Sequence, residues 1–318
     1  MENFEFIDYH HDTDCFLEAL LKGLAQEKKS ISPKFLYDET GSKIFEKICK
    51  LEAYYPTRTE KGILEHNKTE IARILGENAI LIEPGCGSCE KVQLLLDELR
   101  PKAFVPIDIS GEYLGKIAKE LHNKYPWLEL YAIAADYTKP FELPDHLPKG
   151  KRVVFYPGST IGNMRQPNAE IFLKRMADLV GEDGGLLIGV DLQKDVSVLE
   201  RAYNDPSGET EDFIFNIMSR ANKELGADFD LNNFQYHSFY NQEDGRVEMH
   251  LVSKTKQTVT VNGQPFNFNE GESLHTSNSR KFTIPQFEAL ANSAGFYLEK
   301  VWTDTKNYFS VLYLSRKS

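Results

Sequence analysis

Residues 78–91 read Asn-Ala-Ile-Leu-Ile-Glu-Pro-Gly-Cys-Gly-Ser-Cys-Glu-Lys, the strongest fold signal in the chain. A run of apolar residues ends at Glu83, and Gly85 and Gly87 follow directly. After these glycines, apolar residues recur at helical spacing. A strand, a tight glycine turn and a helix in this order form the first unit of a nucleotide-binding α/β sheet. Glycine is needed in such a turn because a Cβ atom would hold the backbone away from a ligand, and because some turns need φ > 0.

Apolar runs typical of buried strands alternate with helical patterns along the chain. Strands separated by single helices predict a parallel sheet with helices on both faces. The last two runs, 296–301 and 308–314, are separated only by a polar turn, so they predict an antiparallel pair that closes the sheet. Strands are expected at 79–82, 103–107, 128–133, 153–156 and 185–190, and helices at 90–100, 111–124 and 168–181.

Two segments do not fit this repeating unit. Residues 1–60 precede the first expected strand, and residues 196–282 interrupt the sheet with a helix, three strands and a turn at Asn262-Gly263. We therefore predict an α/β fold in two domains. Residues 61–195 plus 283–318 form a Rossmann-like sheet domain, and residues 1–60 plus 196–282 form a smaller α+β lobe.

Composition and charge exclude several classes of protein. The formal net charge of −11 and the lack of a Lys/Arg-rich block argue against nucleic acid as a partner. No apolar run approaches the roughly 20 residues of a membrane span. The acidic first residues lack the pattern of a signal peptide, so the cytoplasm is the expected compartment. Nothing indicates an interface between copies, and a monomer is expected.

The cysteines predict neither a disulfide framework nor a metal site. Four cysteines in 318 residues are too few for a disulfide-stabilised fold. Cys86 and Cys89 form a C-x-x-C motif, which can be redox-active or half of a zinc site. Zinc would need a second pair, or two histidines at ligand spacing, and the sequence has neither. We expect these side chains to be small packing residues and expect no metal.

Acidic residues follow the first three expected strands. An acid at the end of strand two, Asp108, can accept both ribose hydroxyls. After strand three, Asp136 can accept from an adenine amino group while Tyr137 covers the ring. Each acid alone is typical of a loop or a helix cap. Together with Glu83 beside a Gly-x-Gly turn they favour a ligand site, and Lys91 can neutralise a carboxylate on that ligand.

The turn itself distinguishes among cofactors. Its spacing is neither the G-x-G-x-x-G of dinucleotide sites nor the G-x-x-x-x-G-K-[ST] of a phosphate loop. A short acid-x-Gly-x-Gly turn resembles the S-adenosylmethionine (SAM) loop of Rossmann-like methyltransferases.

Three strings outside the sheet units sharpen this interpretation. They are Tyr37-Asp-Glu-Thr-Gly-Ser-Lys-Ile-Phe45, Tyr54-Tyr-Pro-Thr-Arg-Thr-Glu60 and Phe155-Tyr-Pro-Gly-Ser-Thr-Ile-Gly-Asn163. They closely resemble the SAM-dependent histidine Nα-methyltransferases of ergothioneine biosynthesis, which make hercynine. The resemblance spans about residues 30–315. Because the same family includes enzymes acting on tryptophan-derived amino acids, it defines the reaction class better than the side chain.

The resemblance implies roles for named residues. Tyr54, Asn163 and Tyr203 would hold the amino-acid backbone in the smaller lobe's substrate site, and Gly158 would shape the loop between the two ligands. Tyr37, or a water, would accept the amine proton, so Tyr37 and Asn163 are the catalytic candidates. The cofactor residues would be Tyr37, Gly85, Lys91, Asp108, Asp136 and Tyr137, to which the loop pattern adds Glu83 and Gly87.

One position departs from the family pattern. The family usually reads Thr-Glu-x-Ser-x-Lys-Phe/Tyr, and its glutamate and serine bind the imidazole. Here residues 276–282 read Thr-Ser-Asn-Ser-Arg-Lys-Phe, so Ser277 replaces the glutamate while Ser279 stays. A neutral serine should weaken the preference for histidine, or admit an indole or a phenol ring. Met249 either lines the same pocket or is a core residue of a strand.

The predicted function is SAM-dependent trimethylation of the α-amino group of a free L-amino acid, with S-adenosylhomocysteine as the second product. Histidine is favoured because the residues that hold the backbone are intact. The same chemistry on tryptophan, tyrosine or a derivative is the alternative. A second alternative is a regulatory protein that binds SAM but has no catalytic activity. The missing third glycine argues against an NAD-type oxidoreductase.

Overall fold

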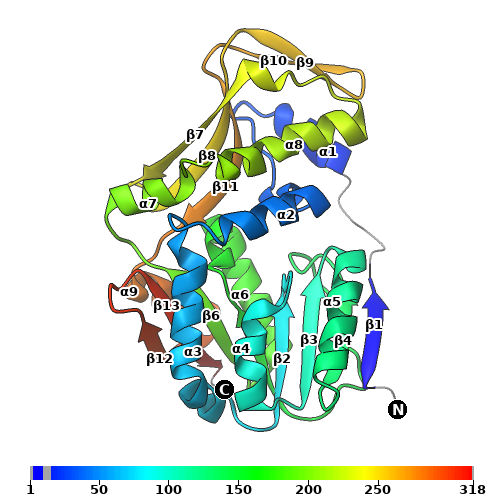
Figure 1. Ribbon diagram of the computed structural model, residues 1–318, viewed down its shortest axis with the longest axis vertical. Coiled ribbons are helices and arrows are strands. Elements are labelled where there is room, and N and C mark those ends of the chain that lie inside the picture. Colours follow the sequence, from blue (N-terminus) through cyan, green and yellow to red (C-terminus); the bar gives the residue numbers. More distant parts are fainter. Residues whose placement is uncertain (1–2, 10–15, 317–318) are drawn as a thin grey trace. The chain divides into compact units, whose positions relative to one another are not determined.

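The computed structural model describes residues 3–9 and 16–316, which divide into two compact units. Among the described residues, the large unit comprises 3–9, 58–192 and 282–316, and the small unit comprises 16–57 and 193–281. Figure 1 traces the chain through both units. No helix in the described residues is both long and apolar enough to cross a membrane.

The large unit is built on one eight-stranded sheet in the order β1-β4-β3-β2-β5-β6-β13-β12. The strands from β1 to β6 pair in parallel, whereas β13 is antiparallel to both β6 and β12. The expected strand–helix alternation and the closing antiparallel pair are thereby confirmed. The strands are β1 (Phe4–Asp8), β2 (Ala79–Pro84), β3 (Ala103–Asp108), β4 (Glu129–Ala134), β5 (Lys151–Tyr156), β6 (Gly185–Asp191), β12 (Phe296–Thr303) and β13 (Phe309–Arg316).

Helices cover both faces of this sheet, which explains its continuous apolar strands. On one face, the strands pack against Phe172 of α6 (Gln166–Val180) and Phe287 of α9 (Ile284–Ser293). On the other face they pack against residues of α3, α4 and α5, among them Leu64 and Leu95. These helices are α3 (Tyr55–Leu75), α4 (Glu90–Leu99) and α5 (Gly111–Lys124).

The first strand corrects one expectation. Residues 1–60 were expected to precede the sheet, but Phe4–Asp8 form β1, which pairs with β4 at the sheet edge. This short segment carries little apolar periodicity because its side chains are only partly buried. An edge strand needs one partner and one buried face, so its sequence signal is weak.

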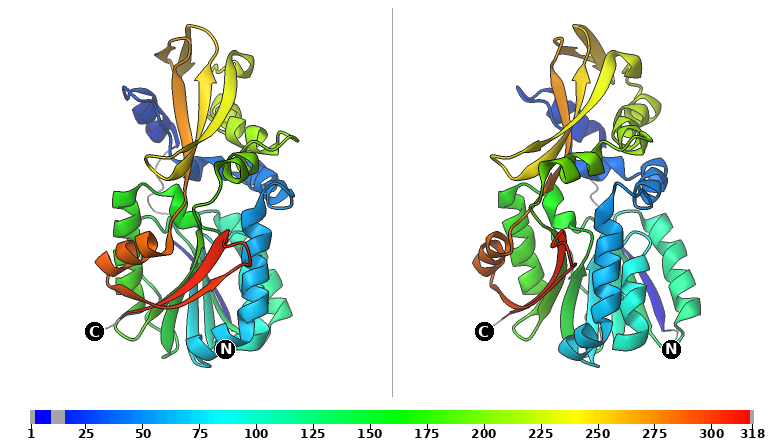
Figure 2. Two further views of the ribbon diagram at one scale, coloured as in Figure 1. Left: turned by 90° about the vertical axis from the view of Figure 1, so that its left-hand side faces the viewer. Right: turned by 60° about the vertical axis from the view of Figure 1, so that its left-hand side comes forward.

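The small unit contains a three-stranded antiparallel sheet in the order β11-β8-β7 and a hairpin of β9 and β10. Asn262 and Gly263 have φ of 47° and 78°, which confirms the expected tight turn. Helices α7 and α8 pack on the sheet (Figure 2). The elements are α1 (Phe16–Leu24), η2 (Pro33–Leu36), α2 (Glu39–Ile48), α7 (Val196–Tyr203), α8 (Glu209–Leu225), η4 (Leu231–Asn233), β7 (Phe234–Asn241), β8 (Arg246–Ser253), β9 (Gln257–Val261), β10 (Gln264–Phe268) and β11 (Ser273–Arg280).

Candidate functional site

The glycine turn after β2 is held against the end of β3 by main-chain hydrogen bonds. The N–H groups of Gly85 and Cys86 donate to the carbonyl oxygen of Ile107 at 2.7 and 3.2 Å. Gly85 and Gly87 have φ of +70° and +53°, in the left-handed region that favours glycine. Both glycines therefore have a conformational reason to be there.

A neighbouring side chain, Tyr137, gives a second, steric reason for glycine at position 85. A Cβ atom at Gly85 would lie 2.9 Å from Cε1 of Tyr137, closer than real side chains come. The Tyr137 ring packs edge-on against Tyr156 and Phe172, with 6.1 Å between ring centroids in both cases. Burial raises the pKa of Tyr137 to about 12, so its hydroxyl keeps its proton at neutral pH. The turn and this ring form a cradle that a side chain at residue 85 would fill.

Asp108 ends β3 with both carboxylate oxygens oriented by the main chain. Its Oδ2 accepts from the N–H of Gly87 at 3.0 Å, and its Oδ1 accepts from the N–H of Ser110 at 2.9 Å. Each carboxylate oxygen has capacity for a further hydrogen bond. This carboxylate can therefore accept two neighbouring hydroxyl groups, as a ribose presents.

Glu83 and Asp136 lie at the same edge of the sheet, since β2, β3 and β4 are parallel neighbours. Glu83 is 2% exposed, and its Oε2 atom has no hydrogen-bond partner within the described part of the chain. Burial raises the pKa of Glu83 well above its usual range; Lys91 opposes this shift, while Glu60 and Asp108 add to it. Buried polar atoms are almost always hydrogen-bonded, so this one indicates a missing partner.

Lys91 meets a buried carboxylate that the sequence did not reveal. Its Nζ donates to Oε2 of Glu60 at 2.6 Å, and Glu60 is 1% exposed. Both oxygens of Glu60 also accept from the N–H of Gly158 at 2.9 Å. Gly158 has φ of +83°, and a Cβ there would lie 3.3 Å from the Lys91 Nζ. Glu60 thus connects α4 with the loop after β5.

Asn163 ends the short helix η3 (Thr160–Asn163), which follows Gly158 in the same loop, and is half-buried. The loop is fixed by Ser159, whose hydroxyl accepts from the N–H of Asp191 at 2.9 Å. Asn163 is therefore presented by a loop attached to both β5 and β6.

Cys86 and Cys89 lie within the turn, and their thiols are unsuited to redox work. They are 8% and 0% exposed. Burial raises the pKa of both thiols, so neither forms a thiolate readily at neutral pH. Packing accounts for this motif.

In the small unit, the tyrosines taken from the family pattern lie in one aromatic cluster. The Tyr37 ring packs edge-on against Phe45 and Phe213, at 5.4 and 5.2 Å between centroids. Phe45 in turn contacts Tyr54 at 6.2 Å, and Tyr54 contacts Tyr203 at 5.9 Å. Edge-on rings fix one another's orientation, so these hydroxyls are carried on a rigid base.

Ser277 and Ser279, from the string that departs from the family pattern, lie on one face of the three-stranded sheet. The same face carries Met249, and we call it the serine face. Ser277 pairs in register with Met249, and both are buried. The Ser279 Oγ accepts from Lys281 Nζ at 2.6 Å and from the Tyr203 hydroxyl at 2.7 Å. Lys281 also donates to the Tyr203 hydroxyl at 2.8 Å and is 1% exposed.

The candidate site residues predicted from the sequence are therefore distributed over both units. The structure adds two residues to this set, Glu60 and Lys281. Both lie inside quoted strings, but no spacing rule marks a buried ion pair or a buried lysine. The large unit contains Glu83, Gly85, Gly87, Lys91, Asp108, Asp136, Tyr137, Gly158 and Asn163, and the small unit contains Tyr37, Tyr54, Tyr203, Met249, Ser277 and Ser279.

Comparison with known proteins agrees with this chemistry. A family model described as SAM-dependent histidine-specific methyltransferase matches residues 16–316. A histidine N-alpha-methyltransferase of Mycolicibacterium smegmatis is 37% identical over 94% of this chain and 95% of its own length. One from Mycobacterium tuberculosis is 36% identical over 91% of each chain. An L-tryptophan methyltransferase of Psilocybe serbica is 25% identical over 93% of this chain and 91% of its own.

The glycine cradle, the oriented Asp108 carboxylate and the unpartnered Glu83 oxygen fit a nucleoside cofactor with an amino-acid tail. The family match extends over nearly all of the described chain. The protein belongs to the family of SAM-dependent histidine-specific methyltransferases.

Proposed function

We propose that this enzyme trimethylates the α-amino group of free L-histidine to hercynine, with the residues named above in the roles that follow. The observation that carries the choice of side chain is the hydrogen-bonding state of Ser279. The alternatives are the same reaction on tryptophan, tyrosine or a derivative, and a SAM-binding regulator without activity.

The large unit holds the cofactor in this proposal. SAM supplies a methyl group already activated on a sulfonium. Asp108 accepts the ribose hydroxyls, Asp136 accepts from the adenine amine and Tyr137 covers the ring. The buried Glu83 Oε2 accepts from, or donates to, the polar tail of the cofactor, which would satisfy it. Lys91, with its charge already matched by Glu60, has further N–H groups to donate to the tail carboxylate.

The protein's work on the amine is positioning and proton removal. A nitrogen attacks only as the neutral amine, so Asn163 and the hydroxyls of Tyr54 and Tyr203 hold it by uncharged hydrogen bonds. Each transfer forms an N–C bond as a C–S bond breaks. After the first and second transfers, the new ammonium must lose a proton, to Tyr37 or water, before it can attack again. The third transfer gives a quaternary nitrogen with no proton to lose.

Ser279 favours imidazole over indole. A hydroxyl has one donor hydrogen and two acceptor lone pairs. Lys281 donates to Ser279, and when the Tyr203 hydroxyl donates to it as well, the hydrogen of Ser279 is left for another group. A neutral imidazole has a nitrogen that can accept it, whereas an indole N–H can only donate. An indole would leave the serine hydrogen unsatisfied, which costs roughly 1–3 kcal/mol when buried.

Ser277 weakens this preference without removing it. It replaces the glutamate that would accept from the other imidazole nitrogen, and a hydrogen bond to a neutral hydroxyl is about half as strong as one to a carboxylate. Histidine therefore remains the best substrate but with reduced affinity.

A competition assay tests this proposal directly. The purified protein is given SAM and an equimolar mixture of the twenty amino acids, and products are identified by mass. We expect histidine carrying three methyl groups. Another methylated amino acid would place the protein among the enzymes with a changed side-chain pocket. No product despite measurable SAM binding would favour the regulator.

The variant Asn163→Ala distinguishes the proposed enzyme from a SAM-binding regulator. An enzyme that methylates amines should lose most of its turnover while its SAM affinity stays unchanged. Unchanged turnover would remove Asn163 from the site.

A further inference from the structure

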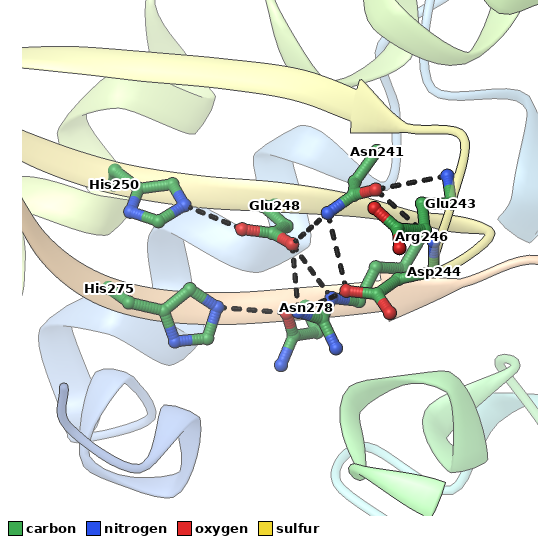
Figure 3. A network of polar contacts seen from close by, with 8 residues as sticks. All are labelled: Asn241, Glu243, Asp244, Arg246, Glu248, His250, His275 and Asn278. Atoms are coloured by element: carbon green, nitrogen blue, oxygen red, sulfur yellow. Dashed lines mark hydrogen bonds and ion pairs between the residues drawn. The ribbon is translucent and has the colours of Figure 1, made fainter. Parts of the chain in front are cut away.

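The three-stranded sheet of the small unit has a second polar face, opposite the serine face. Side chains alternate across a strand, so Glu248 and His250 point away from the side to which Met249 points. On β11, the ladder shifts between His275 and Ser277, a β-bulge that turns His275 to the same side as Asn278. Figure 3 shows Glu248, His250, His275 and Asn278 together, and we call this the histidine face.

Three potential metal ligands meet on the histidine face. One nitrogen from each of His250 and His275 and a carboxylate oxygen of Glu248 all lie within 4.8 Å of one another. The Glu248 Oε2 lies 3.0 Å from the His250 Nε2, and the two imidazole rings meet edge-on at 4.9 Å between centroids. Ligands about 2.0–2.1 Å from a zinc ion are at most about 4.2 Å apart, so small side-chain rotations suffice to close the set.

The surrounding residues hold these ligands in place. Asn241 and Arg246 both donate to the Glu248 Oε1 at 2.9 Å, which leaves Oε2 directed at His250. The His275 Nε2 lies 2.8 Å from the Asn278 Oδ1. Outer hydrogen bonds of this kind orient imidazole and carboxylate ligands at metal sites. Such support distinguishes the cluster from histidines that are merely exposed.

An unsatisfied atom points to a missing partner. The Nδ1 of His250 is buried and has no hydrogen-bond partner within the described residues. When the Nε2 hydrogen is donated to Glu248, Nδ1 carries a bare lone pair. Either ring nitrogen of an imidazole can bind a metal ion, and the buried lone pair shows that hydrogen bonds within the described residues leave part of the capacity of this ring unused. Asp244 forms an ion pair with Arg246 at 2.8 Å and offsets its charge beside the cluster (Figure 3).

We propose that Glu248, His250 and His275 bind one divalent transition-metal ion on the histidine face. Two imidazoles and one carboxylate favour Zn²⁺ or Co²⁺ over Mg²⁺ and Ca²⁺, which prefer oxygen ligands. The ion bonds to both β8 and β11, directly behind Met249 and Ser277. Its role is to fix the serine face from the opposite side of the sheet, and it takes no part in methyl transfer.

The test titrates Co²⁺, then Zn²⁺, into full-length protein that has been treated with a chelator. We expect one ion per chain, with visible Co²⁺ absorption that Zn²⁺ displaces. His275→Gln and Glu248→Gln should each lower the affinity at least tenfold. The matched control is His66→Gln, because His66 is an exposed histidine of α3 outside the ligand set.

The remaining outcomes decide the proposal. The midpoint of urea unfolding of each variant, measured in parallel, establishes that the variant is folded. Absence of binding by the unaltered protein overturns the proposal. So does an equal loss of affinity in His66→Gln and His275→Gln, since it would mean diffuse binding by surface histidines.

Discussion

A lysine with little exposure lies at the candidate site of each unit, half-buried in the large unit and buried in the small one, and the two lysines have different partners. In the large unit, the Lys91 ammonium meets the Glu60 carboxylate at 2.6 Å, with side chains 18% and 1% exposed. In the small unit, the Lys281 ammonium meets the hydroxyls of Ser279 and Tyr203 at 2.6 and 2.8 Å. In the large unit the ammonium is paired with a carboxylate of opposite charge, whereas in the small unit the ammonium orients two neutral hydroxyl groups.

The difference matters for function. A carboxylate cancels the ammonium charge, and both groups then serve mainly to hold α4 and the loop at Gly158 together. A hydroxyl has no charge to cancel, but the ammonium decides which way its hydrogen points. The first arrangement stabilises a backbone, and in the proposed function the second influences which side chain the site can recognise.

The largest effect is expected from Glu60→Gln. The change leaves Lys91 without its countercharge and the Gly158 N–H with one acceptor fewer, so the free energy of unfolding should fall by about 3 kcal/mol. Urea unfolding measures it. Glu170→Gln is the control, because the Lys174–Glu170 pair is 54% and 37% exposed and should change stability by about 0.5 kcal/mol or less. Equal effects in the two variants would refute the structural role of Glu60.

Glu83→Gln tests the pH dependence of the large unit. Because the folded pKa of Glu83 is raised above its unfolded value, its stabilising contribution is present at low pH and is lost as the pH rises toward the folded pKa. The unaltered protein should therefore lose stability relative to the variant as the pH rises above the unfolded pKa of a glutamate, about 4.3, by about 1.4 kcal/mol for each unit by which the folded pKa is raised. Urea unfolding at several pH values checks this. Parallel curves would contradict it.

Lys281→Met addresses the small unit. Without the ammonium, Ser279 can turn its hydrogen toward Tyr203 or present a lone pair to the ligand. The ratio of kcat/KM for histidine to that for tryptophan should fall about tenfold, which corresponds to about 1.4 kcal/mol for a hydrogen bond to a charged group. The control is Lys254→Met, an exposed lysine of the same unit. A uniform loss for both substrates would mean that Lys281 only supports the fold.

Ser277→Glu restores the residue usual in the family and carries the smallest expected effect. A carboxylate accepting from imidazole should raise kcat/KM for histidine about fivefold, since charge-assisted hydrogen bonds exceed neutral ones by about 1 kcal/mol. Kinetics with histidine measures the gain. Asn278→Asp adds the same charge on the opposite face and should leave histidine kinetics unchanged. If both variants act alike, position 277 does not line the side-chain pocket.

Local patterns were the most reliable guide to the fold. The β2 strand is buried throughout, so its sequence is apolar except for Glu83, and Gly85 after it is required by φ and by Tyr137. Asp108 was found because it ends a strand next to that turn. By contrast, the sequence does not mark β1, because this edge strand has only five residues and none of them is fully buried.

Residues that act through distant partners were harder to find. Glu60 and Lys91 lie 31 residues apart, and Lys281 and Tyr203 lie 78 apart. A buried acid or lysine reads in sequence as an ordinary surface charge, since such residues are seldom buried unless paired. The motif strings contained these residues, but only their partners explain them.

The sequence by itself determined the α/β sheet, the glycine turn, the acids at the strand ends and the family. Each depends on periodicity, backbone conformation or short-range order, which neighbouring residues encode. Only the tertiary structure decided which serine accepts from Lys281, which lysine is neutralised and which histidines lie beside Glu248. These depend on hydrogen bonds and charges between segments that are adjacent only after folding, where burial makes each unpaired group costly and each partner decisive.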